Sequence, residues 1–313
     1  MEKILVTGAA GQLGTELTQA LVEKVGAQAV VASDINERAA DRFTCAFEVL
    51  DVLDRDRMEE IIDAHGVTQV YHLAAILSAA GEKNPLFTWD LNMKSLLNVL
   101  ELAREKQLNK IYWPSSIAVF GPGTPMVNTP QDCVMDPTTV YGISKLAGER
   151  WCAYYNKVYG VDVRSIRYPG LISYKAAPGG GTTDYAVEIY HAALKGETFP
   201  CFLEKGTYLP MMYMPDAIKA TLDLMDAPEE NIKVRSSYNV GALSFDPEGI
   251  YESIKKYIPE FEIEYHPDFR QDIANSWPDS IDDSAAREQW GWEPEYDLDT
   301  MTSHILDNLK VEK

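Results

Sequence analysis

The sequence predicts an α/β fold in which helices cover both faces of a doubly wound parallel sheet, followed by a smaller C-terminal lobe. Three observations lead to this fold class. Short apolar runs alternate with helical patterns through the first half of the 313 residues, which is typical of βαβ units. A glycine-rich turn separates the first strand from the first helix. After Pro169 the alternation loosens, and proline, glycine and aromatic residues become frequent.

The individual elements follow from the period of the apolar residues. The predicted strands are Ile4–Thr7, Ala29–Ser33, Val49–Val52, Gln69–Leu73, Lys110–Trp113 and Val161–Ile166. The predicted helices are Leu13–Lys24, Arg55–His65, Leu86–Lys106 and Thr138–Tyr159. Ligands of such sheets bind beyond the carboxyl ends of the strands, near the point where the strand order reverses.

The charge of the chain excludes some classes of partner. It carries 28 Lys and Arg against 48 Asp and Glu, a formal net charge of −20. Nucleic acids and anionic membranes attract basic surfaces, so we predict binding to neither. No apolar run is long enough to span a bilayer, and the chain enters its first strand without a targeting segment. We therefore expect a cytoplasmic protein.

The cysteines give no sign of a metal centre. Cys45, Cys133, Cys152 and Cys201 are widely scattered, without a CxxC pair and without a histidine at ligand spacing. This pattern predicts neither a metal site nor a disulfide framework.

Gly8, Gly11 and Gly14 form a GxxGxxG motif between the first strand and the first helix. A pyrophosphate must approach the backbone closely there, and its charge is favoured at a helix N-terminus. The motif therefore predicts a dinucleotide site, to which we also assign Gln12 and Leu13.

Asp34 ends the second strand, 20 residues after Gly14. A carboxylate there accepts hydrogen bonds from the adenosine ribose hydroxyls and repels a 2′-phosphate, which favours NAD over NADP. Arg38 is the nearest cation. Asp51 and Val52 end the third predicted strand and are expected near the adenine.

Tyr141 and Lys145 lie four residues apart at the start of a predicted helix, so both side chains are on one helical face. A neighbouring ammonium favours the tyrosine phenolate, which then accepts a proton from a substrate alcohol. Ser115-Ser116 follows the fifth strand, where a serine hydroxyl would hydrogen-bond the substrate oxygen.

These features together resemble the extended short-chain dehydrogenases, the NAD-dependent epimerase/dehydratase group. Further segments that carry the resemblance are His72–Ala75, Asn92, Ser115–Gly121, Arg167–Gly170, Met214–Ala217 and Gly291–Pro294. The resemblance implies a Rossmann-type fold, with residues 1–170 binding NAD and carrying the catalytic pair. Residues 171–313 would mainly bind substrate, with some segments returning to the first domain.

The resemblance also implies individual roles. Tyr141 is expected as the general base, Lys145 as a partner of the nicotinamide ribose and Ser116 as the group that holds the substrate oxygen. The remaining residues assigned to the cofactor are Leu73, Ala74, Ala75, Asn92, Tyr168 and Pro169.

Within this group, segments 73–82, 114–122, 167–173 and 179–185 resemble the branch that oxidises the C3 hydroxyl of L-threonine. The residues expected around the amino acid are Ser78, Ser116, Tyr141, Gly180, Thr182, Thr183, Asp184 and Trp277. Asp184 would favour the ammonium, and Trp277 would close over the substrate. No arginine is clearly placed to bind the substrate carboxylate. We hypothesise that backbone N–H groups of the glycine-rich loop 178–181 bind it instead.

Three alternatives remain. Nucleotide-sugar epimerases and dehydratases usually bind the substrate diphosphate through arginines, yet no arginine lies between Arg167 and Arg235. A regulatory NAD sensor would be expected to lose Tyr141 or Lys145. A dehydrogenase of another small alcohol is the third. The long predicted helices Leu86–Lys106 and Thr138–Tyr159 resemble the helices that pair across a two-fold axis in this family. We therefore expect a homodimer.

Overall fold

The computed structural model describes residues 2–175 and 181–311, and its centre is a parallel sheet of six strands in the order β3-β2-β1-β4-β5-β7. The strands are β1 (Ile4–Thr7), β2 (Val30–Asp34), β3 (Ala46–Val49), β4 (Gln69–His72), β5 (Lys110–Tyr112) and β7 (Val163–Arg164). The order reverses between β1 and β4, as in a doubly wound Rossmann sheet, so the predicted fold class is confirmed.

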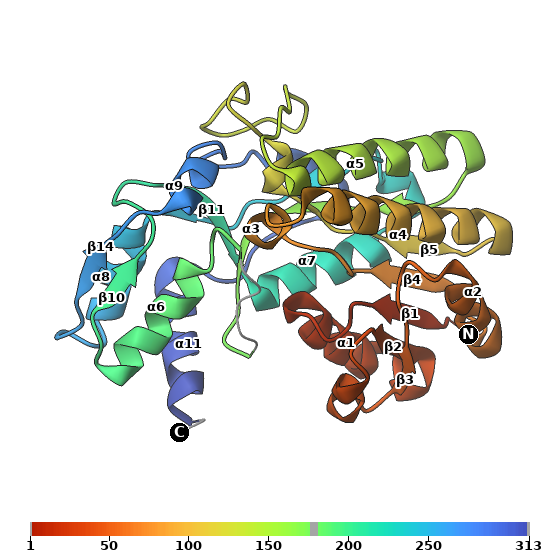
Figure 1. Ribbon diagram of the computed structural model, residues 1–313, viewed down its shortest axis with the longest axis horizontal. Coiled ribbons are helices and arrows are strands. Elements are labelled where there is room, and N and C mark those ends of the chain that lie inside the picture. The colour runs from red at the N-terminus through yellow and green to blue at the C-terminus, as the bar shows by residue number, and fades with distance from the viewer. Residues whose placement is uncertain (1, 176–180, 312–313) are drawn as a thin grey trace.

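Helices cover both faces of this sheet (Figure 1). On one side lie α1 (Gln12–Val25) and α7 (Met214–Asp226), which pack against each other. On the other side lie α2 (Arg55–His65), α4 (Pro85–Lys106) and α5 (Val140–Tyr159). Alternate residues of β1 divide between the two layers: Val6 packs with the α1–α7 side, and Leu5 packs with the α2–α4 side. Both strand faces are thus buried, which explains the continuous apolar runs.

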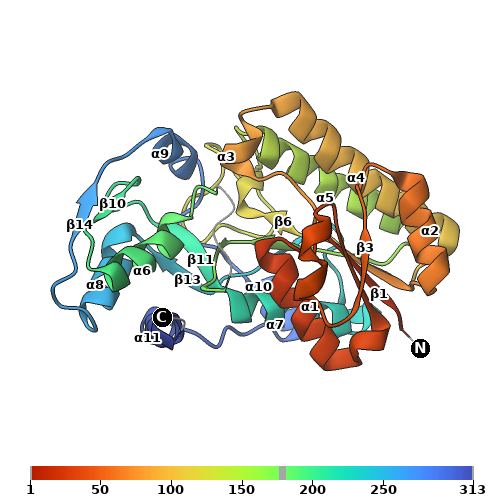
Figure 2. The same ribbon diagram turned by 60° about the horizontal axis from the view of Figure 1, so that its bottom comes forward.

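The later part of the chain builds a second lobe beside the sheet (Figures 1 and 2). Its elements are β9 (Gly170–Ile172), α6 (Tyr185–Lys195), β10 (Phe199–Cys201), β11 (Leu209–Tyr213), β13 (Leu243–Phe245), α8 (Pro247–Lys255), β14 (Ile263–Tyr265), α9 (Phe269–Ala274) and α11 (Leu298–Val311). They share one hydrophobic core. Other late segments pack with the first part of the chain, namely α7, β12 (Tyr238–Asn239) and α10 (Ser284–Trp290).

Several predicted boundaries are wrong. The third strand is Ala46–Val49 rather than Val49–Val52, because Leu50 and Val52 face the core from the turn after it. The predicted strand Val161–Ile166 is replaced by two short strands, β7 and β8 (Ile166–Tyr168), which pair with different neighbours. Most other elements differ from prediction by one or two residues at an end. Among the helices in the described ranges, none is long and apolar enough to cross a membrane.

A side-chain cap fixes the start of α5. Thr139 is the N-cap residue, and its hydroxyl accepts a hydrogen bond of 3.1 Å from the backbone N–H of Gly142. Because Tyr141 lies in this first turn, the cap also fixes where the tyrosine leaves the helix.

We predict that Thr139→Ala lowers the free energy of unfolding by about 1 kcal/mol, the usual value of an N-cap. Urea denaturation measures it. Thr139→Ser keeps the hydroxyl and is the matched control. Equal losses in both variants would mean that the cap contributes nothing.

Candidate active site

The glycine turn after β1 is shaped by close backbone contacts. Gly8 has a φ of +70°, and a Cβ there would lie 2.7 Å from the backbone nitrogen of Ala74. A Cβ on Gly14 would collide with the carbonyl oxygen of Gly8. Gly11 is the N-cap of α1 and offers no side-chain acceptor to the first helical N–H groups. The helix N-terminus therefore faces the cleft with its backbone donors, which suits a pyrophosphate.

Two adjoining cavities, of about 230 and 270 Å³, share Gly8, Gly11, Leu73 and Ala75 in their walls and form one cleft across the carboxyl ends of the strands. The second cavity is also lined by Asp34, Asp51, Val52 and Ala74. The first cavity is lined by the remaining predicted cofactor residues: Gln12, Leu13, Gly14, Tyr141, Lys145, Tyr168 and Pro169.

Asp34 is held in place by the backbone around it. Its carboxylate accepts hydrogen bonds from the N–H groups of Ala10 and Asn36, each of 3.0 Å. Asp51 is held in the same way by the N–H of Leu53, at 2.9 Å. This end of the cleft thus presents two oriented carboxylates. They can accept hydrogen bonds from the ribose hydroxyls and the adenine amino group of NAD, and they would repel the 2′-phosphate of NADP.

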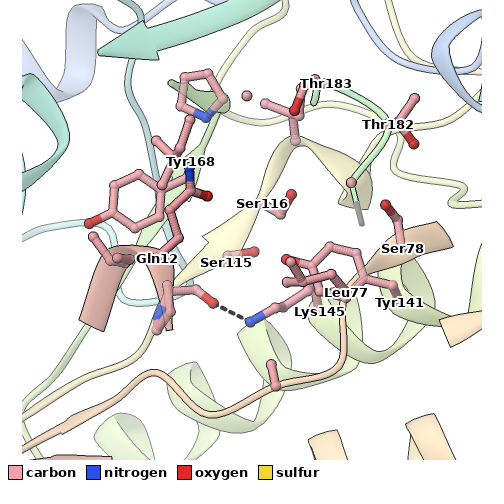
Figure 3. Close-up of a pocket in the computed structure, with 18 of the residues that line it drawn as sticks. Gln12, Leu77, Ser78, Ser115, Ser116, Tyr141, Lys145, Tyr168, Thr182 and Thr183 are labelled. Atoms are coloured by element: carbon pink, nitrogen blue, oxygen red, sulfur yellow. Dashed lines mark hydrogen bonds between the residues drawn. The ribbon is translucent and has the colours of Figure 1, made fainter. Parts of the chain in front are cut away.

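Gln12 gives an independent sign that the cleft takes a polar ligand. Its Nε2 atom is buried and has no hydrogen-bond partner among the described residues. Buried donors are rarely left unsatisfied in folded proteins. Figure 3 shows Gln12 beside Tyr168 on one side of the cavity, opposite Ser78, Thr182 and Thr183.

The predicted catalytic residues meet at the centre of the first cavity (Figure 3). Tyr141 and Lys145 come from the first turns of α5, and Ser116 ends β6 (Ser115–Ser116). A hydrogen bond from Ser116 lowers the pKa of Tyr141, but burial has the larger effect and raises that pKa to about 12.

The expected effect of Lys145 on Tyr141 is not found in this structure. The Lys145 Nζ donates a 2.6 Å hydrogen bond to the carbonyl of Pro114 and lies 4.5 Å from the ring centre of Trp113. Burial lowers the pKa of Lys145 to about 7. The Lys145 Nζ also lies 5.5 Å from the ring centre of Tyr141. The phenolate favoured by lysine therefore stays a prediction, and the burial of both side chains opposes it.

The other side of this cavity carries short polar side chains. Ser78, Thr182, Thr183, Asp184 and Trp277 all line it, as predicted for the substrate. The Thr182 hydroxyl is buried and has no partner among the described residues. The N–H of Gly181 donates a 2.7 Å hydrogen bond to Asp184, so this N–H is engaged within the protein. The role of the glycine loop in binding the carboxylate stays a hypothesis, because its residues before Gly181 lie outside the described ranges. Gly180 lies outside the described residues.

Asn92 is the one described cofactor candidate that lines neither cavity. Its side-chain amide bonds both backbone groups of Ile76, at 2.9 and 3.1 Å, and also donates to Ser144. It therefore holds the segment that carries Leu73–Ser78.

Sequence reasoning missed some lining residues: Ile35, Leu50, Ile76, Leu77, Leu91, Pro114, Ser115, Ile117, Gly170, Leu171 and Gly181. Most adjoin a predicted residue in the chain, which was the available signal. In the described parts of the chain, no group of three His, Cys, Asp or Glu side chains is arranged to hold a metal ion.

We predict that Asp34→Asn weakens NAD binding by about tenfold or more and narrows the preference for NAD over NADP, because a charged acceptor is lost. Isothermal titration calorimetry with both dinucleotides measures this. Asp51→Asn is the comparison variant and is expected to change NAD affinity less. An unchanged NAD affinity in Asp34→Asn would remove Asp34 from the ribose site.

Comparisons with known proteins show the family to which the chain belongs. A model of the NAD dependent epimerase/dehydratase family matches residues 4–241. An uncharacterized epimerase/dehydratase of Staphylococcus aureus is 51% identical over 313 residues, covering 99% of this chain and 97% of its own.

Two solved structures are also similar over nearly their whole length. An L-threonine dehydrogenase from Cupriavidus necator, in its holo form, is 56% identical with a TM-score of 0.96, covering 98% of this chain and 99% of its own. A monomeric L-threonine 3-dehydrogenase from a metagenome is 50% identical with a TM-score of 0.95, covering 99% of each chain.

Proposed function

The chain belongs to the NAD dependent epimerase/dehydratase family, and we propose that it is an L-threonine 3-dehydrogenase. It would oxidise the C3 hydroxyl of L-threonine to 2-amino-3-oxobutyrate, with NAD reduced to NADH and one proton released. One observation carries the proposal: the cavity that holds Tyr141 and Ser116 opens onto short hydroxyl side chains and a single carboxylate, a pocket suited to a small zwitterion.

The chemistry divides among the residues at the cavity centre. Ser116 hydrogen-bonds the C3 hydroxyl oxygen, and Tyr141 accepts the hydroxyl proton as general base. NAD, when bound, supplies the acceptor for the hydride that leaves C3. Tyr168 and Pro169 border the nicotinamide, and Lys145 holds its ribose. In this division residues 1–170 mainly bind NAD, and residues 171–313 mainly bind the substrate.

The amino acid group faces the second part of the chain. The Thr182 hydroxyl, buried without a partner, is the strongest candidate donor to the substrate carboxylate, together with Ser78. Asp184 favours the ammonium by its charge. Trp277, 6% exposed, lines the same cavity and would pack against the bound substrate.

The nucleotide-sugar alternative lacks a partner for its diphosphate. None of the described residues that line the two cavities is an arginine, and Lys145 is their sole cation. The sensor alternative conflicts with the presence of both Tyr141 and Lys145. Other small alcohols remain possible substrates and belong in the same assay.

We also propose a homodimer, formed in the cytoplasm, through the outer face of α5. Ile143, Trp151, Tyr154 and Val158 are all exposed, and their spacing puts them on one side of the helix. Large apolar side chains exposed on one helix face often mark a contact with a partner, and two-fold pairing with a second copy would cover them symmetrically.

We predict NADH formation, followed by its absorbance, with L-threonine and NAD. D-threonine, L-allo-threonine, L-serine and 3-hydroxybutyrate are expected to react more slowly. Tyr141→Phe should lower kcat by about 10²- to 10⁴-fold, the usual contribution of a general base, and leave NAD affinity nearly unchanged. The control is Tyr208→Phe, at an exposed tyrosine outside both cavities. If the protein binds NAD but L-threonine gives no rate, the substrate assignment is wrong.

For the assembly, we predict that Tyr154→Glu shifts a dimer to a monomer in sedimentation experiments, because a charge would be buried in the contact. Tyr208→Glu should leave the mass unchanged. A wild-type protein that sediments as a single chain would refute the dimer.

A further inference from the structure

A buried ion pair lies directly behind the active site. Glu149 on α5 and Arg167 on β8 are both almost completely inaccessible to solvent. Two hydrogen bonds join them, from Arg167 Nε to Glu149 Oε1 at 2.9 Å and from Arg167 Nη2 to Glu149 Oε2 at 2.8 Å. This bidentate arrangement fixes the orientation of both side chains.

The pair joins several segments of the chain. Ser115 donates a 2.7 Å hydrogen bond to Glu149 Oε1. The remaining nitrogen of Arg167 donates to the carbonyl of Gln131 at 2.9 Å and to the side chain of Asn239 at 3.0 Å. Helix α5, strands β6, β8 and β12 and the loop before α5 therefore meet at one carboxylate–guanidinium unit.

Each of the three side chains Ser115, Glu149 and Arg167 is close along the chain to a residue of the active site. Ser115 precedes Ser116, and Arg167 precedes Tyr168. Glu149 lies one helical turn beyond Lys145 on the same face of α5. A shift of this unit would move the groups that hold the substrate oxygen, border the nicotinamide and carry the ammonium.

Stability alone does not explain the pair. Burying two charges costs about as much free energy as their attraction returns, and apolar residues of similar volume are often as stabilising. The chain has a second buried pair, Asp162 with Arg164 at 2.8 Å, in which Arg164 donates to backbone carbonyls at the C-terminal end of α7 and Asp162 also pairs with Arg235. The Asp162–Arg164 pair therefore serves as the control in the experiments below, as a buried ion pair with a structural role alone.

The titratable groups around Lys145 show how Glu149 affects the pKa of this lysine. Tyr141, Cys152 and Glu149 lie on its own helix, and His72 faces it from β4. Burial lowers the pKa of His72 to about 3, and burial raises the pKa of Cys152, so both are uncharged near neutral pH. Glu149, one helical turn from Lys145, raises the pKa of Lys145 and so favours its ammonium form against burial.

We propose that the Glu149–Arg167 pair is a positioning device of the active site and favours the ammonium form of Lys145 against its burial. Its effect on turnover rests on the proposed function. Its effect on Lys145 does not, so the two are measured separately.

The first experiment follows Lys145 directly, by NMR of protein labelled with ¹³C at the lysine Cε. Lys145→Arg assigns the resonance. In the wild-type protein, we expect Lys145 to titrate well below the surface lysines, which titrate near pH ~10.4. Glu149→Gln should move its midpoint to still lower pH, since a neighbouring negative charge is lost. Asp162→Asn, the matched control at the reference pair, should leave it unchanged. An unchanged midpoint in Glu149→Gln overturns the electrostatic role.

The second experiment separates position from stability. Glu149→Gln leaves Arg167 buried and unpaired, so a loss of thermal stability is expected. The double variant Glu149→Gln/Arg167→Met removes both charges and should recover stability, yet keep the lowered Lys145 midpoint and a kcat reduced by about a hundredfold through misplacement. If the double variant keeps the wild-type kcat and the wild-type titration midpoint of Lys145, the pair has a structural role alone and the proposal is wrong.

Ser115→Ala decides the case if neither variant folds, because it removes one charge-assisted hydrogen bond and leaves the ion pair in place. It should lower kcat for L-threonine about tenfold, lower the thermal midpoint less than Glu149→Gln does, and leave NAD affinity within error. A wild-type kcat in Ser115→Ala would overturn the positioning role. If wild-type protein has no activity with L-threonine while Glu149→Gln still shifts Lys145, the proposed function has failed and the electrostatic part of this inference stands.

Discussion

The close packing of α5 on the segment 113–118 is the constraint on which the site depends. A Cβ on Gly142 would overlap the carbonyl oxygen of Ala118, and a Cβ on Gly148 would overlap the ring of Trp113. The helix therefore reaches a backbone distance that only glycine allows. At this distance Lys145 contacts the Pro114 carbonyl, and Tyr141 stands beside Ser116. The chemistry of the pocket follows from this single helix-to-strand contact.

The charge of the chain adds a second, longer-range constraint. With a formal net charge of −20, the protein as a whole attracts cations and repels polyanions. Lys145 is the sole cation among the described lining residues, whereas Asp34, Asp51 and Asp184 all line the cleft. In the proposed site, helix and turn N–H groups, and no side-chain cation, would face the pyrophosphate of NAD. A second diphosphate would have no such support, which favours a substrate without net charge.

The sequence was sufficient where a feature is local and insufficient where it depends on packing. The glycine turn, Asp34 and the Tyr141–Lys145 spacing are local patterns, and the structure brings all of them to one cleft. The third strand was misplaced because Leu50 and Val52 are buried without belonging to a strand. Asn92 and Glu149 act through residues 16 and 18 positions away, Ile76 and Arg167. The periodicity of apolar residues in one sequence does not predict hydrogen bonds between side chains and residues so far apart in the chain.

The pKa directions place a further condition on the chemistry. In the protein without ligand, burial keeps Tyr141 protonated and leaves Lys145 close to half-protonated at neutral pH. A general base is thus absent until another positive charge lies near the Tyr141 hydroxyl. The oxidised nicotinamide ring is positive and the reduced ring is neutral, so the Tyr141 proton is held less tightly before hydride transfer than after it. The direction of this change matches proton removal from an alcohol during its oxidation. In the proposed reaction, burial of Tyr141 would therefore couple its protonation state to the redox state of the bound cofactor.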